Sequence, residues 1–401
     1  DTRKSGDMLE AALTAGLCSM GAKVIPLGVV PTPAVAYLTR YYKADAGVVI
    51  SASHNPCEYN GIKFFNSDGY KLSDGIEHEI ESYILGEKAI EELPTHGKVG
   101  YVSANHNAVE DYVAFAVSTI DCRLDGMKIA VDCANGASYE TAFKALNKLG
   151  ANVEAIHNTP DGVNINHMCG STHMESLQAY VTSIGADIGI AFDGDADRML
   201  AVDENGKLID GDQIMAACAK FMRDNGTLKQ NTLVATVMSN LGLFMAGEKI
   251  GINIPRTKVG DRYVLEEMLA KGYNIGGEQS GHIIFLDHNT TGDGLVSALQ
   301  FLSVLKKTGM KASEAASIVT VMPQVLRNAV VKLENKNSYM ENEEIAAACK
   351  ALEDEFAGEG RVLIRPSGTE PLVRVMIEGK DEEYITKKAE ELAELIEKIL
   401  G

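Results

Sequence analysis

VVISASHNPCEYNGIKFF, residues 48–65, begins as an apolar run and turns polar within a few positions. Residues 47–50 are typical of a buried strand because both of its faces are apolar. The polar residues that follow are Ser51, Ser53, His54, Asn55 and Pro56. They indicate either an ordinary turn, which Asn-Pro favours, or a nucleophilic serine at the carboxyl end of a parallel sheet, where open α/β sheets bind ligands.

The alternation of helix and strand around this stretch recurs along the chain. We expect helices over residues 7–20, from Pro33 with Thr32 as cap, and over 138–149, 173–184, 241–250 and 261–271. Strands are expected at residues 22–25, 46–50, 128–132, 150–153, 186–192, 199–202, 233–237, 251–254 and 273–276. Such alternation is typical of parallel βαβ units. Because three strands end in the polar loops SASHNP, DGDADR and GEQSGH, we predict three similar α/β domains of mostly parallel sheet.

The last 80 or so residues follow a different pattern. Strands are expected at 328–333, 362–365 and 372–378, and helices at 341–356 and 382–399. The tight RPSGTEP loop between two of the strands predicts an antiparallel hairpin, and hence an α+β domain. The predicted domains are residues 1–100, 104–205, 207–318 and 322–401.

Composition excludes several classes of function. The chain has 401 residues, enough for about two to four domains, and a formal net charge of −19, which disfavours nucleic acid and anionic membranes as partners. Positive charge for an anionic substrate must therefore be local. No apolar stretch approaches the ~20 residues of a membrane span, and no signal-peptide pattern is present. Seven cysteines stand singly, which favours reduced thiols and a cytoplasmic location.

The DGDADR loop predicts a metal site. Asp193, Asp195 and Asp197 alternate, so three carboxylates can converge on Mg²⁺ or Ca²⁺. Residues 193–204 also fit a calcium-loop pattern ending at Glu204, but its sixth place requires glycine and holds Arg198. Strand-like flanks further exclude an EF-hand. Because three carboxylates leave octahedral Mg²⁺ short of ligands, an anionic substrate or side-chain group should complete the site.

The RPSGTEPLVR stretch, residues 365–374, carries polar groups suited to binding a phosphate. Arg365 offers a planar fork for phosphate, and Arg374 lies on the next strand. Hydroxyls and backbone N–H groups that can form an anion nest come from Ser367, Gly368 and Thr369. The alternative is a simple hairpin turn.

In GEQSGH, Glu278 and Ser280 can hold sugar hydroxyls or an amine, while His282 is either a site residue or a core histidine. Candidate counter-charges, which are otherwise ordinary surface charges, are Arg3, Lys63, Lys258 and Arg262. A serine nucleophile, a carboxylate metal site, a polyol-binding pair and a phosphate nest together predict phosphoryl transfer on a sugar phosphate.

The motifs also appear in the order of a known family. They are ISASHNP with NGIKFF, VDCANGA, GVNIN, IAFDGDADR, DGDQIM, KVGDRYV, GGEQSGH, TTGDG and RPSGTEPLVRVM, which span nearly the whole chain. The sequence thus resembles the α-D-phosphohexomutases, and most closely their bacterial amino-sugar branch. The resemblance implies four domains around one central cleft.

Site roles follow from the resemblance by position. Ser53 would be the phosphorylated serine, and its phosphate would be a further ligand of one Mg²⁺ bound by Asp193, Asp195 and Asp197. Catalytic-cleft positions would be His54, Lys63, Arg198 and His282. The substrate would be held by Lys258, Glu278, Ser280, Arg365, Ser367, Gly368, Thr369 and Arg374, of which Arg365, Ser367 and Thr369 would grip the phosphate that is not transferred.

The implied reaction interconverts glucosamine 6-phosphate and glucosamine 1-phosphate. Phospho-Ser53 would donate to the substrate, and the bound glucosamine 1,6-bisphosphate would turn round and return the other phosphate. The product would feed UDP-N-acetylglucosamine and cell-wall synthesis in the cytoplasm, and a homodimer is compatible with the resemblance. GEQSGH and KVGDRYV favour the amino sugar. The alternatives are a phosphomannomutase or phosphoglucomutase of the same fold, an idle Mg²⁺- and phosphosugar-binding protein, and a phosphatase with Asp193 as its nucleophile.

The chain opens with DTRKSG, without a preceding strand. Family members carry a further N-terminal segment with a TDGIRG-like loop. The resemblance therefore implies a first domain without its first strand and helix, and we expect this chain to fold and bind Mg²⁺ but to turn over slowly.

Overall fold

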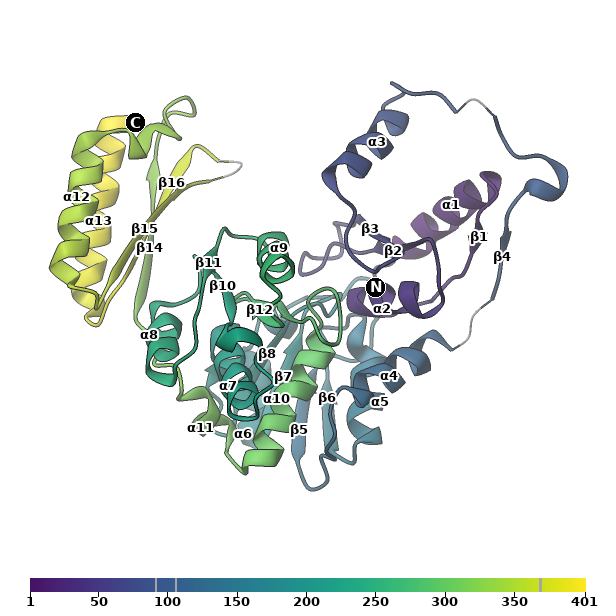
Figure 1. The fold of residues 1–401 in the computed structure, drawn as a ribbon, viewed down its shortest axis with the longest axis horizontal. Coiled ribbons are helices and arrows are strands. Elements are labelled where there is room, and N and C mark those ends of the chain that lie inside the picture. The colour runs from purple at the N-terminus through teal and green to yellow at the C-terminus, as the bar shows by residue number, and fades with distance from the viewer. Residues whose placement is uncertain (91, 105–106, 368–369) are drawn as a thin grey trace. The chain divides into compact units, whose positions relative to one another are not determined.

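The computed structural model describes residues 1–401 except residues 91, 105–106 and 368–369. The chain divides into two compact units, the first of residues 1–238 with 251–318 and the second of residues 239–250 with 319–401. Among the described residues, unit 1 has four sheets and unit 2 has one, and each unit has a hydrophobic core of its own. The elements can be followed by label in Figure 1.

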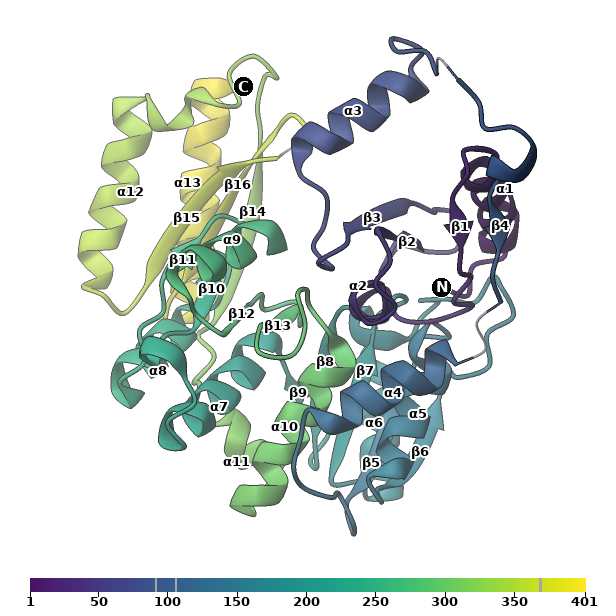
Figure 2. The ribbon, with the colours of Figure 1, turned by 45° about the vertical axis from the view of Figure 1, so that its right-hand side comes forward.

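The first part of unit 1 carries two small sheets instead of one. Its helices are α1 (Gly6–Ser19), α2 (Thr32–Tyr41) and α3 (Asp74–Ile84). Strands β1 (Lys23–Val24) and β4 (Tyr101–Val102) pair in parallel, and β2 (Ala46–Ile50) and β3 (Ile62–Asn66) pair antiparallel (Figure 2). The prediction that SASHNP ends a parallel strand is therefore wrong for β2. The amide of Ser51 donates to the carbonyl of Gly61 at 2.9 Å, so the loop closes a local hairpin.

The predicted helix cap at Thr32 is also wrong. Thr32 is already the first residue of α2, and the helix begins without a side-chain cap hydrogen bond. The reason is tertiary, because the Thr32 hydroxyl donates to Asp195 Oδ2 at 2.6 Å, far along the chain. A hydroxyl engaged in this way is not available to the first turn of its own helix.

The second part of unit 1 contains the five-stranded sheet. Its strands are β5 (Lys128–Asp132), β6 (Asn152–Ile156), β7 (Ile188–Phe192), β8 (Met199–Asp203) and β9 (Leu208–Ile209), in the order β6-β5-β7-β8-β9. Its helices are α4 (Ala108–Ser118), α5 (Ser138–Lys148) and α6 (Glu175–Ile184). Pairing of β5 with β6 and β7 is parallel, as predicted, whereas β7 and β8 are antiparallel. Leu177 and Val181 of α6 pack on this sheet.

The third part of unit 1 repeats the scheme. Strands β10 (Val234–Thr236), β11 (Arg256–Thr257), β12 (Ile275–Gly277) and β13 (Ile283–Phe285) form a sheet in the order β11-β10-β12-β13. Its helices are α7 (Gly211–Asp224), α9 (Asp261–Lys271), α10 (Gly294–Thr308) and α11 (Ala312–Ala316). In all three parts a polar loop joins two antiparallel strands: SASHNP joins β2 to β3, DGDADR joins β7 to β8, and GEQSGH joins β12 to β13.

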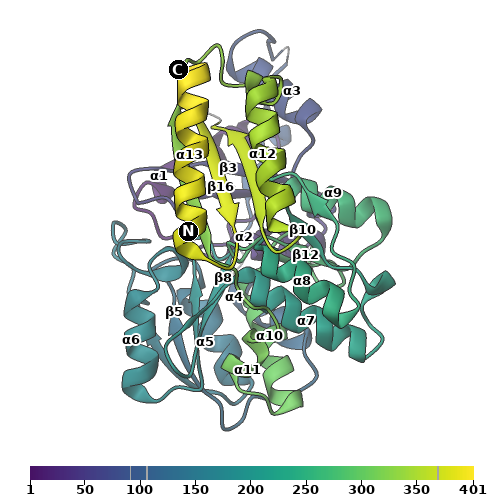
Figure 3. The ribbon, with the colours of Figure 1, turned by 90° about the vertical axis from the view of Figure 1, so that its left-hand side faces the viewer.

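Unit 2 is the predicted α+β domain together with α8 (Leu241–Ile250). Strands β14 (Gln324–Val330), β15 (Arg361–Pro366) and β16 (Leu372–Glu378) form an antiparallel sheet in the order β14-β16-β15. Helices α12 (Glu343–Phe356) and α13 (Glu382–Leu400) cover one face of it (Figure 3). Val373, Ile385 and Ile396 are among the buried residues of its core. The predicted fold class is confirmed, while the predicted domain boundaries and the central cleft stay predictions.

Four short 3₁₀ segments, His96–Lys98, Gly170–Thr172, Lys229–Asn231 and Ser338–Met340, complete the described elements. All seven cysteines are free thiols. Among the described residues, no helix combines the length and apolar character needed to cross a membrane.

Candidate active site

Ser53 lies at the start of the loop between β2 and β3, residues 51–61, called the serine loop below. Its hydroxyl points to the DGDADR loop, residues 193–198, called the metal loop below. Its Oγ donates to Asp193 Oδ2 at 2.7 Å, and its amide donates to Ser51 Oγ at 2.9 Å. The backbone of Ser53 has φ +51°, a left-handed conformation that costs a non-glycine residue about 1 kcal/mol. Strain of this kind persists only where surrounding contacts fix the backbone.

Arg3 is one of the groups that fix this backbone. It is buried, and its Nη2 donates to the carbonyl of Ser53 at 2.8 Å while its Nη1 donates to that of Pro56 at 2.6 Å. Its Nε pairs with Asp1 Oδ2 at 2.9 Å, and the same oxygen accepts from Ser51 at 2.6 Å. Sequence reasoning offered Arg3 as a counter-charge for substrate; in the structure its guanidinium anchors the serine loop.

The three predicted carboxylates meet in the loop between β7 and β8. Asp193, Asp195 and Asp197 are buried, and one oxygen from each lies within 4.8 Å of the others. Among the described residues, Asp195 Oδ1 and Asp197 Oδ1 have no hydrogen-bond partner. Buried carboxylate oxygens without a partner are costly, and a hard cation satisfies them. The donor set therefore fits Mg²⁺.

The crowding of the three carboxylates changes the pKa of Asp193. Burial, together with the charges of Asp197 and Asp195, raises the pKa of Asp193 well above its usual range. A proton on Asp193 is thus one way in which the cluster relieves its repulsion, and a bound cation is another.

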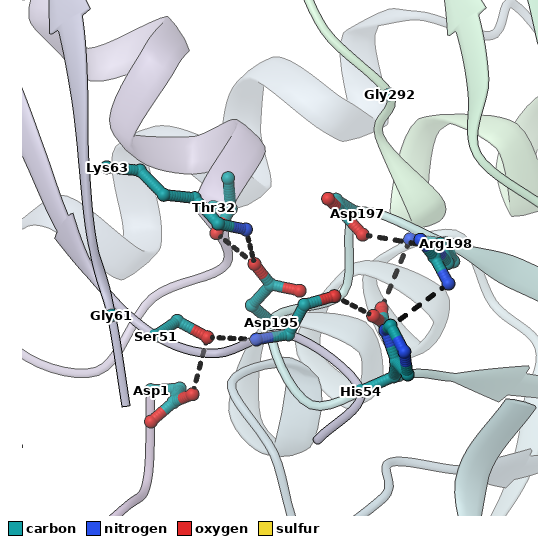
Figure 4. Close-up of polar contacts among 12 residues, drawn as sticks. Asp1, Thr32, Ser51, His54, Gly61, Lys63, Asp195, Asp197, Arg198 and Gly292 are labelled. Carbon is teal, nitrogen blue, oxygen red and sulfur yellow. Dashed lines mark hydrogen bonds and ion pairs between the residues drawn. The ribbon is translucent and has the colours of Figure 1, made fainter. Parts of the chain in front are cut away.

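Asp195 is held through its other oxygen by two groups from the first part of unit 1. Lys63 Nζ lies 2.8 Å from Oδ2, and Thr32 Oγ1 donates to it at 2.6 Å (Figure 4). Burial opposes the charge of Lys63, but Asp195 and Asp197 outweigh it and raise the pKa of the ammonium. Thr32 is a site residue that sequence reasoning missed, since its only local signal is a position before proline.

Arg198 and His54 lie together beside the carboxylates. The Arg198 amide donates to Asp193 Oδ1 at 3.2 Å, and its Nη1 lies 3.4 Å from His54 Nδ1. A guanidinium can only donate, so Nδ1 accepts and the proton of neutral His54 is on Nε2. Burial and the charge of Arg198 lower the pKa of His54. His54 is therefore a neutral donor next to Ser53 at physiological pH.

His282 is buried behind the metal loop. Its Nδ1 lies 3.5 Å from Asp197 Oδ2, and the amide of Gly292 donates to its Nε2 at 3.2 Å. A Cβ on Gly292 would lie within 2.4–2.6 Å of the ring, so only glycine allows this contact. The role of His282 visible here is to support Asp197, and its contact with substrate stays a prediction.

The predicted sugar-binding residues lie at the end of the third sheet. Glu278 Oε1 accepts from the amide of Gly260 at 3.1 Å, which joins the GEQSGH and KVGDRYV motifs. Ser280 is exposed, and so is Lys258, whose Nζ lies 5.7 Å from the Tyr263 ring. The structure thus brings Glu278 next to the loop of Lys258, and their binding of a sugar stays a prediction.

In unit 2, two of the predicted phosphate-binding residues face each other. Arg365 of β15 is in register with Arg374 of β16, and burial together with the Arg374 charge lowers the pKa of Arg365. Like charges opposite each other destabilise a sheet, and an anion bound between them would relieve the repulsion. The Ser367 amide donates to the carbonyl of Leu372 at 2.8 Å, so it is not available to a nest.

Gly368 and Thr369, also predicted for the phosphate site, lie outside the described residues. The approach of this loop to Ser53 stays a prediction.

A second network supports the loops of the five-stranded sheet. Asp132, at the end of β5, accepts from the amides of Ala134 at 2.8 Å and Gly170 at 3.0 Å, and its Oδ2 lies 2.9 Å from His157 Nδ1. Its hydrogen bond to Asp132 raises the pKa of His157. Asp132 thereby ties together the segments that follow β5 and β6.

This network predicts a pH-dependent contribution to stability. Because the folded pKa of His157 exceeds its unfolded value of about 6.5, its contribution is complete below that pH and is lost as pH rises through the folded pKa. His157→Asn keeps a residue that tolerates φ +47° but cannot be protonated. The melting temperature of the variant should fall below that of the parent at pH 5.5, and the difference should shrink by pH 9. A difference independent of pH would contradict the assignment.

The site combines a serine hydroxyl with buried carboxylates and a lysine on hairpin loops of α/β sheets. This combination of groups suits metal-assisted phosphoryl transfer. Models of phosphoglucomutase/phosphomannomutase domains match four successive segments: domain I at residues 1–91, domain II at 109–206, domain III at 210–322 and the C-terminal domain at 329–395. The chain belongs to the phosphoglucomutase/phosphomannomutase family. The family predicted from the motifs is thus confirmed.

Individual relatives agree with this assignment. A phosphoglucosamine mutase of Ruminiclostridium cellulolyticum is 63% identical over 397 residues, covering 99% of this chain and 88% of that protein. A family protein of known structure from Burkholderia thailandensis superposes with a TM-score of 0.81 at 22% identity, covering 98% of this chain and 87% of that one. An Aspergillus fumigatus N-acetylphosphoglucosamine mutase in complex with GlcNAc-6P and magnesium gives a TM-score of 0.68 at 19% identity, covering 92% and 93%.

Proposed function

We propose that this chain is a mutase that interconverts glucosamine 6-phosphate and glucosamine 1-phosphate. The observation that carries the proposal is the Ser53 hydroxyl, held 2.7 Å from Asp193 at the edge of three buried carboxylates. The amino-sugar substrate is supported by the relative at 63% identity, which is named phosphoglucosamine mutase.

In the proposed reaction, phospho-Ser53 is the phosphoryl donor. The oxygen of a sugar hydroxyl attacks phosphorus, the bond from phosphorus to Ser53 Oγ breaks, and glucosamine 1,6-bisphosphate forms. The hydroxyl proton passes in net to Ser53 Oγ, and the return transfer gives a proton back to the sugar oxygen. The bisphosphate turns round within the site, and its other phosphate is returned to Ser53. Mg²⁺ bound by Asp193, Asp195 and Asp197 would withdraw negative charge from the transferring group.

Side chains around the serine supply the remaining positive charge and hydrogen bonds. Lys63 stays cationic because its pKa is raised, so it can stabilise charge on the phosphoryl oxygens. Arg198 stays cationic for the same reason, since the carboxylates outweigh the effect of its burial and raise its pKa. Neutral His54 can donate a hydrogen bond from its Nε2–H to the phosphoryl group on Ser53. Free glucosamine 1,6-bisphosphate would restore the phosphoenzyme whenever the phosphate is lost.

The test compares substrates on one preparation of enzyme. Purified chain with Mg²⁺ and trace glucosamine 1,6-bisphosphate is offered glucosamine 6-phosphate, glucose 6-phosphate and mannose 6-phosphate, and the first should give the highest kcat/KM. Faster turnover of a neutral sugar would instead indicate a phosphoglucomutase or phosphomannomutase.

The fate of labelled phosphate separates the remaining alternatives. Label from the bisphosphate should map to Ser53. Label on Asp193 with release of inorganic phosphate would indicate a phosphatase, and binding without transfer would indicate an idle phosphosugar-binding protein.

Arg365→Lys should raise the KM for glucosamine 6-phosphate by about tenfold or more. The planar guanidinium can hold two phosphate oxygens at once, and an ammonium cannot reproduce that geometry. Steady-state kinetics measure the effect. The matched control is Arg327→Lys, because Arg327 lies on the edge strand β14 and forms an ion pair with Glu390. Equal KM values for parent and Arg365→Lys would show that the RPSGTEP loop is only a turn.

A further inference from the structure

Asn166 has no role in the chemistry described so far, yet it contacts the serine loop directly. It belongs to the GVNIN motif, in the segment after β6, and is only 6% exposed. Its Nδ2 donates to the carbonyl of Ser53 at 2.9 Å and to that of Asn55 at 3.0 Å. Since both partners are carbonyls, which only accept, the amide orientation is fixed by its surroundings.

The two carbonyls flank His54, so one side chain holds the turn that carries both Ser53 and His54. The metal loop lies directly against this contact. A Cβ on Gly194 would meet both Asn166 Nδ2 and the carbonyl of Ser53 at 2.6 Å. Asn166, the serine loop and the metal loop are therefore packed together without space for a side chain at Gly194.

The backbone that carries Asn166 is itself fixed. Asn166 has φ +57°, a conformation that asparagine tolerates better than most residues. Its amide donates to the carbonyl of Ala134 at 2.9 Å, and the Ala134 amide donates to Asp132 at the end of β5. The Asn166 carboxamide is thus anchored through backbone hydrogen bonds to the five-stranded sheet that also carries the carboxylates. Its two acceptors belong to the loop after β2.

We propose that Asn166 is a positioning residue that keeps the Ser53 loop in a fixed position relative to the metal loop during both phosphoryl transfers. The inference rests on the proposed function and adds a residue that acts through Ser53 without touching substrate. Because Ser53 has a strained backbone, releasing one of its two carbonyl donors lets the turn relax while Arg3 still holds the loop folded. Displacing a nucleophile by about 1 Å can cost ~100-fold in rate.

The variant that tests this is Asn166→Gly, which accepts φ +57° and removes the side chain together with its carboxamide. Asn164→Ala is the matched control, because Asn164 lies in the same segment but, among the described residues, its side chain bonds to Asp161 and Thr159 nearby and not to the Ser53 loop. Asn166→Asp is a second variant that keeps the volume and the backbone preference but has no N–H to donate.

Two measurements are made on each variant of the 401-residue chain. Steady-state kinetics with glucosamine 6-phosphate should show kcat lower by about 10- to 100-fold in Asn166→Gly and Asn166→Asp, with KM and the half-saturating Mg²⁺ concentration within about twofold of the parent. Hydrogen exchange should be faster in peptides covering residues 51–61 and unchanged in those covering β5 and β7. Asn164→Ala should match the parent in both.

The proposal is overturned if Asn166→Gly keeps kcat within twofold of the parent, if Asn164→Ala loses as much activity, or if exchange rises throughout unit 1 in step with the loss. The exchange measurement uses no substrate. If the parent chain does not convert glucosamine 6-phosphate, the proposed reaction is refuted. The effect of Asn166 on the order of residues 51–61 can still be tested by exchange.

Discussion

Ser53→Ala is expected to lower mutase turnover by at least about 10⁴-fold, because it removes the hydroxyl that we propose carries the phosphoryl group between the two half-reactions. Ser53 Oγ lies 2.7 Å from Asp193, and its backbone is held by Arg3 and Asn166 through the carbonyl. None of the backbone contacts depends on the hydroxyl. The variant should therefore fold and melt close to the parent, and kinetics with added glucosamine 1,6-bisphosphate measure the loss.

Ser51→Ala is the matched control for this prediction. Ser51 lies two residues earlier, is buried, and accepts from the Ser53 amide. Its loss should loosen the turn and reduce the rate, but a phosphate should still be found on Ser53 by mass mapping. If Ser53→Ala retained more than a few per cent of parent turnover, or if the phosphate mapped to Ser51, the nucleophile would be misassigned.

Asp195→Asn is expected to weaken the binding of Mg²⁺ by at least about tenfold and to lower kcat by on the order of 100-fold or more. Asp195 Oδ1 is buried without a hydrogen-bond partner among the described residues, while Oδ2 is held by Lys63 and Thr32. Substitution removes the charge of a proposed metal ligand and leaves Lys63 facing a neutral amide in place of a carboxylate. It also removes repulsion within the carboxylate cluster, so the melting temperature without Mg²⁺ should shift by only about 3 °C.

The dependence of rate on Mg²⁺ concentration measures the effect, and Glu204→Gln provides the control. Glu204 stands at the twelfth place of the discarded calcium pattern, and the structure pairs it with Ser313 instead. Its variant should keep the Mg²⁺ dependence of the parent. Unchanged Mg²⁺ dependence in Asp195→Asn, or a change of similar size in Glu204→Gln, would contradict the assigned metal site.

Local sequence signals predicted the parts of the site that lie on contiguous loops. DGDADR places Asp193, Asp195 and Asp197 on one tight turn, so their convergence depends on backbone geometry that the spacing alone conveys. Parallel pairing in the second and third sheets followed from alternating helices and strands. The motifs, read in order, predicted the family and the mutase chemistry, which the domain matches and the 63% identical relative support.

Sequence alone failed where a residue's partner lies far along the chain. Thr32 looks like a helix cap, but its hydroxyl is taken by Asp195, 163 residues away. Asn166 and Arg3 carry no local sign that they hold the carbonyl of Ser53, 113 and 50 residues away. The antiparallel pairing of β2 with β3 depended on closure of the loop from Ser51 to Gly61.

What the sequence by itself determined is therefore the family and its mutase class, because the candidate nucleophile, carboxylates and basic residues lie in short motifs that residue type and spacing define. What the tertiary structure decided is the geometry. The hydrogen bonds of Thr32 and Asn166 join the first and second parts of unit 1, that of Arg3 joins distant segments of the first part, and their partners are selected by distance in space. A hydroxyl, amide or guanidinium can bond many groups with similar energy, so its own sequence neighbourhood does not specify which one it meets.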